Sequence, residues 1–197
     1  MNPVPELWRE IFSVIAIAIT FIAFGPYLWA IWRGTNRPHV FSWVIWALVT
    51  LVVFFAQLAG GGGVGAWPTA VSGVVTIVAA VMAWMKRGEA TITRLDWAFL
   101  AGALAALPAW ALSSDPLAAV IVLTVVDLLG FGPSFRKAFM APGEEHIGLY
   151  SFGILRNIVH IAALEQLNFT TVLYPAAVFA ACIVFVGYVL ARRRALA

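Results

Sequence analysis

The sequence predicts an all-α polytopic membrane protein: seven transmembrane helices, built as two parallel three-helix repeats that a linker helix joins. Hydrophobic residues make up 63% of the 197 residues and charged residues 11%, whereas about a quarter of a soluble domain is charged. The apolar segments are continuous runs, unlike the alternating, turn-separated segments of a membrane β-barrel. Two landmarks of the first half also recur in the second half at one fixed spacing, which predicts the repeat.

Seven apolar runs approach the roughly 20 residues that a helix needs to cross the hydrocarbon core of a bilayer. They predict helices at 10–32, 40–58, 66–85, 95–113, 117–139, 147–166 and 171–191. The first helix is expected to stay in the mature protein, because acidic and aromatic residues precede it instead of the basic region of a signal peptide. Pro68 and Pro175 are expected at helix starts, where proline is tolerated.

The internal repeat rests on two sequence landmarks. Phe24-Gly25-Pro26 recurs as Phe131-Gly132-Pro133, and Trp67-Pro68 recurs as Tyr174-Pro175. The offset is the same in both cases (133 − 26 = 107; 175 − 68 = 107). Many transporters are built from such repeats, with the substrate site between them. The predicted domains are a first triple-helix repeat at 1–90, a linker helix at 91–115 and a second triple-helix repeat at 116–197.

The basic residues predict how the chain is oriented in the membrane. With the N-terminus outside, ten of the twelve lysines and arginines fall in cytoplasmic segments: Arg33, Arg37, Lys86, Arg87, Arg94, Arg136, Lys137, Arg192, Arg193 and Arg194. The positive-inside rule therefore predicts a plasma (inner) membrane protein with its N-terminus outside and its C-terminus in the cytoplasm. Basic loop ends beside an anionic leaflet also account for the net charge of +3, so no nucleic-acid partner is expected.

In each predicted repeat, a proline lies near the cytoplasmic end of the first helix, and an aligned pair, Ser42-Trp43 or Ser151-Phe152, lies near the start of the second helix. Together with the three-plus-one-plus-three order of helices, this pattern resembles the PQ-loop and SWEET transporter superfamily over nearly the whole chain. The Pro-Gln pair that names the superfamily is replaced here by Pro26-Tyr27 and Pro133-Ser134. The resemblance implies a central pocket between two triplets that rock between inward-open and outward-open states.

The predicted hinge for this rocking consists of Gly25, Pro26, Gly132 and Pro133. Each proline removes one backbone hydrogen bond and clashes with the preceding turn, and each glycine softens the same turn. The alternative is that a Gly-Pro pair merely bends or ends its span for packing. Recurrence of the pair in both repeats favours the hinge.

Polar residues at membrane depth are the main candidates for a site, because they are costly there and are usually functional. Asp127 is the deepest acidic residue, whereas Arg156, Asn157 and His160 share one face of a helix at 3.6 residues per turn. Histidine changes charge near neutral pH, and burial favours the protonated form of a carboxyl group. We therefore predict Arg156 and Asn157 as substrate-binding residues, and Asp127 and His160 as proton-coupling residues. A purely structural ion pair between Asp127 and Arg156 is the alternative.

Two tryptophans of the second predicted helix are further candidates for substrate binding. Trp43 and Trp46 lie well inside that helix, and a wall of tryptophan suits a planar or sugar-like ligand. They are equally suited to helix packing. Most of the other tryptophans are expected in the aromatic belts at the membrane interfaces.

The predicted function is transport of a small polar solute by alternating access, either as uniport or coupled to protons. A seven-helix receptor or sensor of the same architecture, without flux, is the alternative. The chain is not predicted to be an enzyme, because it lacks the His-Glu-x-x-His, paired-aspartate and Gly-x-Ser-x-Gly motifs. Accordingly, no catalytic residue, metal or cofactor is expected. The expected partners are a small-molecule substrate and the lipid bilayer, and a homo-oligomer stays open.

Overall fold

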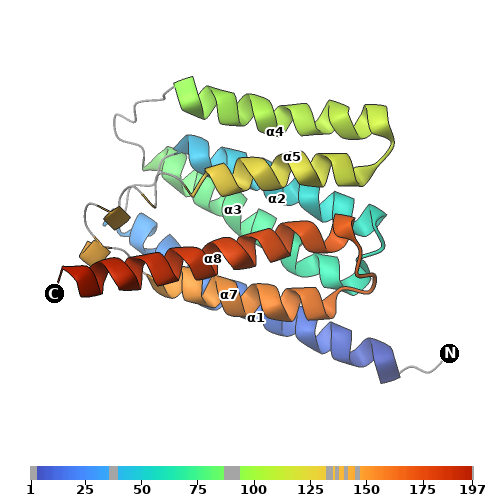
Figure 1. Cartoon of the computed structure of the whole chain (residues 1–197), viewed down its shortest axis with the longest axis horizontal. Helices are drawn as coiled ribbons and strands as arrows, with labels where there is room; N and C mark the ends of the chain where they lie inside the picture. The colour runs from blue at the N-terminus through green and yellow to red at the C-terminus, as the bar shows by residue number, and fades with distance from the viewer. Residues whose placement is uncertain are drawn as a thin grey trace.

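The computed structural model describes residues 4–35, 40–86, 94–131, 135, 138–139, 142–144 and 147–196. Within these ranges the chain forms α-helices and short 3₁₀ turns, without a strand, which confirms the all-helical fold class (Figure 1). The helices are α1 (Val4–Trp32), α2 (Val40–Ala59), α3 (Trp67–Met85), α4 (Arg94–Ser113), α5 (Pro116–Leu129), α7 (Ile147–Ala163) and α8 (Phe169–Ala195). The 3₁₀ turns are η1 (Gly63–Ala66) and η2 (Pro142–Glu144).

Local side-chain chemistry determines where two of these helices begin. The Asp115 carboxylate accepts a hydrogen bond from the Leu117 N–H at 2.9 Å, and Pro116 is the first residue of α5. Asn168 and Thr171 form a capping box at the start of α8. Because this cap lies upstream of the predicted start, Pro175 lies inside α8 and its expected place at a helix start is wrong. The same expectation for Pro68 is confirmed in α3.

The fifth predicted span, 117–139, is wrong in its length. α5 ends at Leu129, and Gly130 and Phe131 form a turn. A glycine weakens a helix and a proline cannot donate a backbone hydrogen bond, so the run from Gly130 to Pro133 opposes continuation. By contrast, Pro26 lies within the unbroken helix α1.

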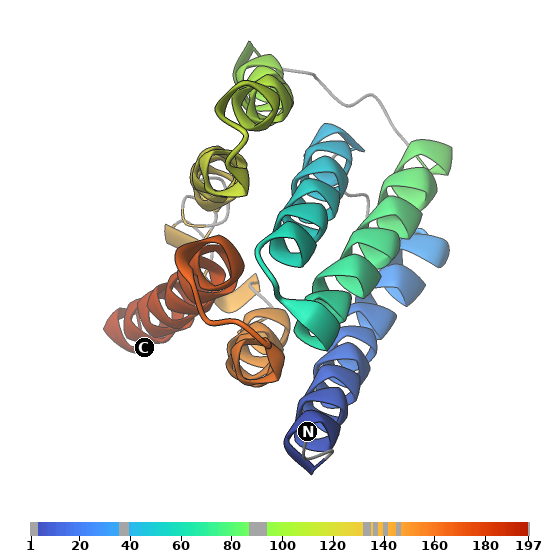
Figure 2. The ribbon, with the colours of Figure 1, turned by 90° about the vertical axis from the view of Figure 1, so that its right-hand side faces the viewer.

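Six of the described helices contact one another in a cyclic order: α1, α3, α2, α5, α8 and α7, after which α7 contacts α1. Figure 2 looks along the bundle and shows this order, with α4 outside it, against α5 and α2. We call α1, α2 and α3 the first half, and α5, α7 and α8 the second half. The halves meet where α1 contacts α7 and where α2 contacts α5.

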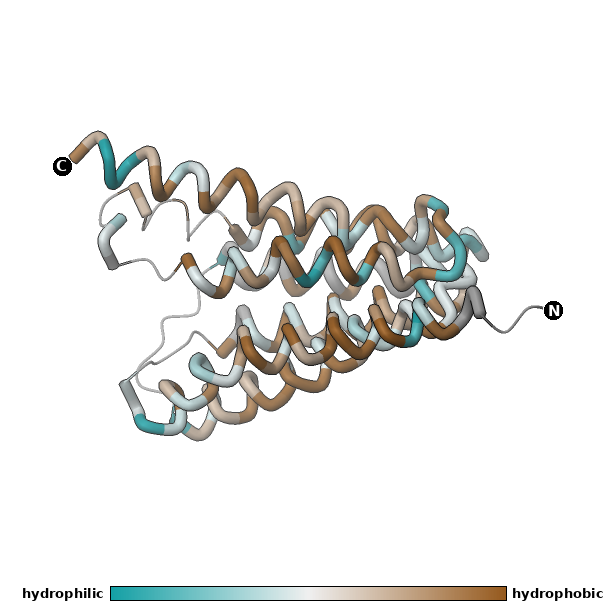
Figure 3. Tube along the Cα trace, turned by 90° about the horizontal axis from the view of Figure 1, so that it is seen from below, coloured by the Kyte–Doolittle hydropathy of each residue, from teal (hydrophilic) through white to brown (hydrophobic). Residues whose placement is uncertain are grey.

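The surface of this bundle is apolar and much of its polar chemistry is inside. Three stretches of helix are long and apolar enough to cross a membrane: Leu7–Trp32, Gly63–Met85 and Phe169–Ala195. Long hydrophobic stretches follow the helices in Figure 3, whereas hydrophilic residues gather mainly towards the ends of the bundle. The buried polar residues are Ser13, Thr20, Thr50, Gln57, Thr69, Thr76, Thr124, Asp127, Asn157, His160 and Thr171. Such a distribution suits a lipid environment, in which polar groups need partners within the protein.

The two ends of the bundle differ in the segments that they carry. The N-terminus and the links α2–α3, α4–α5 and α7–α8 lie at one end, which we call the N-terminal end (Figure 1). The C-terminus lies at the opposite end, which we call the C-terminal end.

Aromatic clusters form within each half towards the C-terminal end. In the first half, Trp43 is buried with Ala79 and Ala80, and Phe24 and Tyr27 pack against it. In the second half, a corresponding cluster surrounds Phe185, with these neighbours: Phe131, Phe135, Ala138, Ile147, Tyr150, Tyr188 and Val189. Each half therefore has a core of its own at this end.

Candidate functional site

Arg156 lies near the middle of α7, nine residues from its start and seven from its end (156 − 147 = 9; 163 − 156 = 7). Its Nε donates a hydrogen bond to Thr20 Oγ1 of α1 at 3.0 Å. Its Nη2 donates to the Pro68 carbonyl oxygen at 2.8 Å and to Ser72 Oγ at 2.7 Å, both on α3. Its Nη1 donates to the Asn157 side-chain oxygen at 3.3 Å. This side chain of the second half thus holds both α1 and α3 of the first half.

The neighbouring polar residues of α7 are buried at the same interface. The His160 ring is fully buried, and its Nε2 lies 3.4 Å from Thr69 Oγ1 on α3. Asn157 is also buried, and its Nδ2 donates to the Gly153 carbonyl oxygen at 2.8 Å. The structure therefore brings Arg156, Asn157 and His160 together between α7 and the first half.

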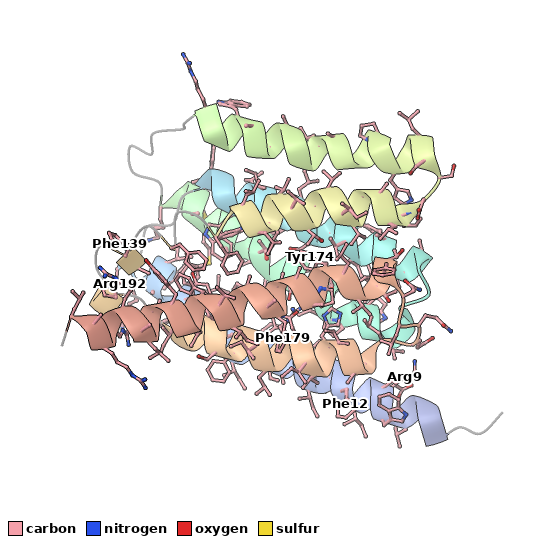
Figure 4. All side chains as sticks on the ribbon, viewed as in Figure 1. Arg9, Phe12, Phe139, Tyr174, Phe179 and Arg192 are labelled. Atoms are coloured by element: carbon pink, nitrogen blue, oxygen red, sulfur yellow. The ribbon has the colours of Figure 1, made fainter. Side chains whose placement is uncertain are left out.

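Asp127 lies apart from this group, near the end of α5. It is buried, and the Tyr174 hydroxyl of α8 donates a hydrogen bond to its Oδ1 at 3.3 Å (Figure 4). In the cyclic order of helices, α8 lies between α5 and α7. The hydrogen bonds of Arg156 described above all go to uncharged oxygens. An ion pair between Asp127 and Arg156 is therefore not formed, and that alternative is wrong.

Two residues of α8 lie within electrostatic reach of both charged groups. Tyr174 interacts electrostatically with Asp127 and with Arg156, and so does Cys182. Cys182 also faces α7, because a Cβ placed on Gly153 would lie 3.2 Å from the Cys182 Sγ. A solute between the halves near this part of α8 would experience both charges.

The two candidate tryptophans differ in what they contact. Trp43 is buried within the cluster of the first half, where Tyr27 lies 5.1 Å away between ring centroids. Trp46 is only half-buried and meets Trp43 edge-on, with ring centroids 5.2 Å apart. A Cβ placed on Gly130 would lie 3.1 Å from the Trp46 indole nitrogen, so this ring reaches the end of α5. Of the two, Trp46 is the one at the boundary between the halves.

The structure describes only the first of the two predicted hinge pairs. Gly25 and Pro26 lie on the exposed side of α1, and a Cβ added to Gly25 would meet no atom within 4 Å. A substitution at Gly25 would therefore alter backbone freedom without steric conflict. Gly132 and Pro133 lie outside the described residues.

At the N-terminal end, the α2–α3 link and the α7–α8 link are joined by hydrogen bonds, and we call this the loop–loop contact (residues 60–66 with 164–171). The Glu165 Oε1 accepts from the Val64 N–H at 3.0 Å, and the Glu165 N–H donates to the Gly62 carbonyl at 3.1 Å. Asn168 Nδ2 donates to the Gly60 carbonyl at 2.8 Å. Main-chain and side-chain groups of both links thus hold the halves together.

Three side chains of α1 and α2 extend the loop–loop contact to neighbouring helices. Arg9 of α1, labelled in Figure 4, donates from Nη1 to the Leu164 carbonyl at 2.9 Å. Ser13 of α1 donates to the Val64 carbonyl at 2.9 Å. Gln57 of α2 donates from Nε2 to the Thr171 carbonyl of α8 at 2.9 Å. These bonds tie α1 and α2 to the links.

The hydrogen bond from Gln57 replaces one that a proline in α8 cannot make. In a regular helix, the Thr171 carbonyl would accept a hydrogen bond from the N–H four residues later. That residue is Pro175, which has no N–H. Gln57 supplies the missing donor from the other half, so the proline of one half makes a partner in the other half necessary.

Glycines permit the close approach of the two links. Gly61 and Gly63 have positive φ values of 82° and 56°, a backbone conformation that residues other than glycine rarely adopt. A Cβ placed on Gly65 would overlap the backbone of Ala163 and Leu164. A glycine is therefore required at Gly65 for steric reasons.

Sequence reasoning missed several residues of this arrangement. Thr20 was visible only as the repeat counterpart of Asp127 (127 − 107 = 20), and Ser72 gave no signal. Tyr174 was recognised only as part of the repeated landmark Tyr174-Pro175. The glycine run at 60–63 was not among the candidates, although it lies in the loop–loop contact.

Comparisons with known proteins do not identify the chain. No protein-family model, no curated protein and no solved structure matches it. We therefore argue function from the contacts described above.

Proposed function

We propose that this chain is an integral membrane transporter that moves a small polar solute by alternating access, as uniport or coupled to protons. The observation that carries the proposal is the set of buried and half-buried polar side chains at the interface of the two halves. Arg156, Asn157 and His160 lie there, in the middle of an apolar bundle. Polar groups at membrane depth are costly and mark solute pathways.

The order of helix neighbours supports the repeat within this proposal. In the first half α3 lies between α1 and α2, and in the second half α8 lies between α5 and α7. In this comparison α1 corresponds to α5, α2 to α7 and α3 to α8. If each helix is exchanged for its counterpart, the contact of α1 with α7 becomes the contact of α5 with α2, which is also present. A twofold relation of this kind follows from two similar triplets, with α4 as the linker. Seven spans in total then place the two termini on opposite sides.

The loop–loop contact supports alternating access, because its hydrogen bonds join the halves on one side of the polar site. In the proposed orientation the N-terminus is outside, in agreement with the described basic residues Arg33, Lys86, Arg94, Arg192, Arg193 and Arg194 at the other end. The loop–loop contact then closes the outer side. Release to that side requires its hydrogen bonds to break while the halves rock.

A receptor or sensor without flux is the second candidate, and one observation favours it. Four of the five N–H donors of Arg156 are already used by protein acceptors, three of them in the first half. A cation engaged to this extent can serve to fix the halves relative to one another. Ligand binding would then alter that arrangement without transport.

A disulfide across the loop–loop contact separates these candidates. A Cβ on Gly60 would lie 3.1 Å from the Thr170 Cβ, slightly closer than the roughly 3.5–4.5 Å of a disulfide. We expect Gly60→Cys with Thr170→Cys, in a Cys182→Ala background, to form a disulfide after a small adjustment of the backbone. The single-cysteine variants are the matched controls.

The assay begins with a thermal-shift screen of the purified protein against sugars, amino acids, nucleosides, vitamins and organic acids at two pH values. A solute that binds the folded form raises its apparent stability. Flux of that solute into liposomes is then measured for the oxidised and reduced double variant. We expect oxidation to abolish flux and reductant to restore it, with no such change in the controls. Binding without flux in any variant would establish the receptor instead, and equal flux with the disulfide formed would rule out opening at this contact.

A further inference from the structure

The charge balance of the polar site gives information about the solute, provided that the proposed transport function holds. Arg156 is separated from either end of α7 by at least seven residues, which is roughly 10 Å of helix. Its described hydrogen-bond partners are a threonine and a serine hydroxyl, a backbone carbonyl and an amide oxygen. All of these are neutral, so they orient the guanidinium but none of them balances its positive charge.

Among the residues that the structure describes, the groups that face Arg156 from each neighbouring element are uncharged or cationic. From α1 and α3 they are Thr20, the Pro68 carbonyl and Ser72, and from α8 they are Tyr174 and Cys182. On α7 itself, His160 is close enough to interact electrostatically with Arg156, and a protonated imidazole would add to the positive charge. Asp127 hydrogen-bonds to Tyr174 instead.

Asp127 and Arg156 differ in how they can become neutral. A buried carboxyl group can take up a proton and lose its charge. An arginine guanidinium stays protonated in proteins under all ordinary conditions. The cation at the interface is therefore permanent and the anion is not, and a half-buried charge in an apolar bundle is unfavourable when no opposite charge balances it.

We infer that the transported solute carries an oxyanion, a carboxylate or a phosphate, and that Arg156 provides its counter-charge in the closed site. Guanidinium is suited to this role, because its planar N–H groups match the geometry of both oxyanions. One Nη1 N–H remains beyond the four hydrogen bonds described, and the Arg156 side chain is partly accessible. Entry of one negative charge would neutralise the site. A neutral sugar would leave the cation uncompensated.

Thermal unfolding of the purified full-length chain in neutral detergent tests this inference with defined probes. The probes are acetate, succinate and inorganic phosphate at equal ionic strength, with chloride as the salt control and glucose as the neutral control. We expect at least one carboxylate, or phosphate, to raise the unfolding temperature above the chloride reference. The arms with carboxylates and with phosphate identify which oxyanion is preferred.

Variants distinguish a binding role of Arg156 from a structural one. Arg156→Gln should lower the apparent affinity for the oxyanion, obtained from the dependence of the unfolding temperature on its concentration, by about tenfold or more. This is the loss expected for a hydrogen bond to a charged group. Arg194→Gln removes the same charge from an exposed position at the end of α8 and should respond as the wild type does. Where Arg156→Gln fails to fold, Arg156→Lys retains the charge but loses the planar fork and should show a reduced response.

Ser72→Ala provides a second test, in which the Arg156 cation is retained. It deletes one neutral partner of Arg156, so the basal stability should fall while the oxyanion response persists. Stabilisation by glucose alone, or an unchanged oxyanion response in Arg156→Gln, would overturn the inference. The disulfide-dependent flux of a neutral solute would overturn the inference and leave transport standing. If oxyanion binding requires Arg156 but no flux is ever observed, Arg156 is confirmed as an oxyanion-binding residue and the proposed transport is excluded.

Discussion

The two ends of the bundle hold the two halves of the chain in different ways. At the N-terminal end, the loop–loop contact joins the halves through main-chain carbonyls, Glu165 and Asn168. Towards the C-terminal end, aromatic clusters around Trp43 and Phe185 stabilise each half separately. Hydrogen bonds between exposed links can break and form again, whereas a close-packed aromatic core is stable as a unit. A rigid-body motion of the halves can therefore leave the aromatic clusters intact, but it must break the loop–loop contact, the Arg156 hydrogen bonds to α1 and α3, and part of the packing of α2 against α5.

The largest expected effect comes from removing the core of the second half. Phe185 is fully buried, and its ring lies 4.3 Å from that of Tyr150 between centroids. We expect Phe185→Ala to reduce stability by about 3–5 kcal/mol, because a large cavity remains. Thermal unfolding in detergent measures the loss, and hydrogen exchange of residues 60–66 should keep its wild-type protection. Early exchange there would show that the two ends are not independent.

Gly65→Ala should weaken the loop–loop contact at the N-terminal end of the bundle. Its added Cβ would overlap the backbone of Ala163 and Leu164, and overpacking of this kind costs about 1–3 kcal/mol. We expect faster hydrogen exchange of residues 60–66 and 164–168, with the aromatic clusters unaffected. Gly148→Ala is the matched control, since a Cβ at that position on α7 meets nothing within 4 Å. Equal behaviour of the two variants would contradict the close approach at Gly65.

Gln57→Leu tests the hydrogen bond that Pro175 makes necessary. Leucine has a similar size but cannot donate to the Thr171 carbonyl, which would remain buried and unpaired. We expect a loss of about 1–3 kcal/mol in thermal or denaturant unfolding. In a Pro175→Ala background the helix can supply its own N–H, so the same substitution should cost less. A cost that is unchanged by the second substitution would refute the compensation between halves.

Glu165 provides the smallest of the four effects. Glu165→Ala removes the acceptor for the Val64 N–H in an exposed link, for an expected loss of about 1 kcal/mol. Glu165→Gln retains an acceptor oxygen and should be close to the wild type in stability. A loss in the glutamine variant equal to that in alanine would indicate that charge, rather than the hydrogen bond, matters at this position.

Much of the helical framework could be predicted from the sequence, because apolar runs of membrane-spanning length have few stable conformations in lipid other than a helix. The ends of α2, α3 and α4 lie within a residue or so of their predicted places. The errors arose where two sequence signals compete. Asn168 and Thr171 cap α8 ahead of Pro175, and the turn at Gly130 ends α5 within an apolar run.

The candidate site was only partly predictable, for a physical reason. Helical periodicity places Arg156, Asn157 and His160 on one face, since that is a property of a single helix. Which side chains meet Arg156 depends on how α7 packs against α1 and α3, and no local pattern contains that information. Thr20 and Ser72 are ordinary polar residues of apolar helices until the tertiary structure places them beside the guanidinium.

The sequence alone thus determined the helical class, the apolar surface, the repeated landmarks and the polar face of α7, because each follows from composition or from spacing along the chain. Only the tertiary structure decided the cyclic order of helices, the separation of Asp127 from Arg156 and the loop–loop contact. The loop–loop contact joins residues about a hundred positions apart, whereas Asp127 and Arg156 lie on different helices that do not bring them together. These features are set by how whole helices pack against one another, which the spacing of residues within a single helix does not specify.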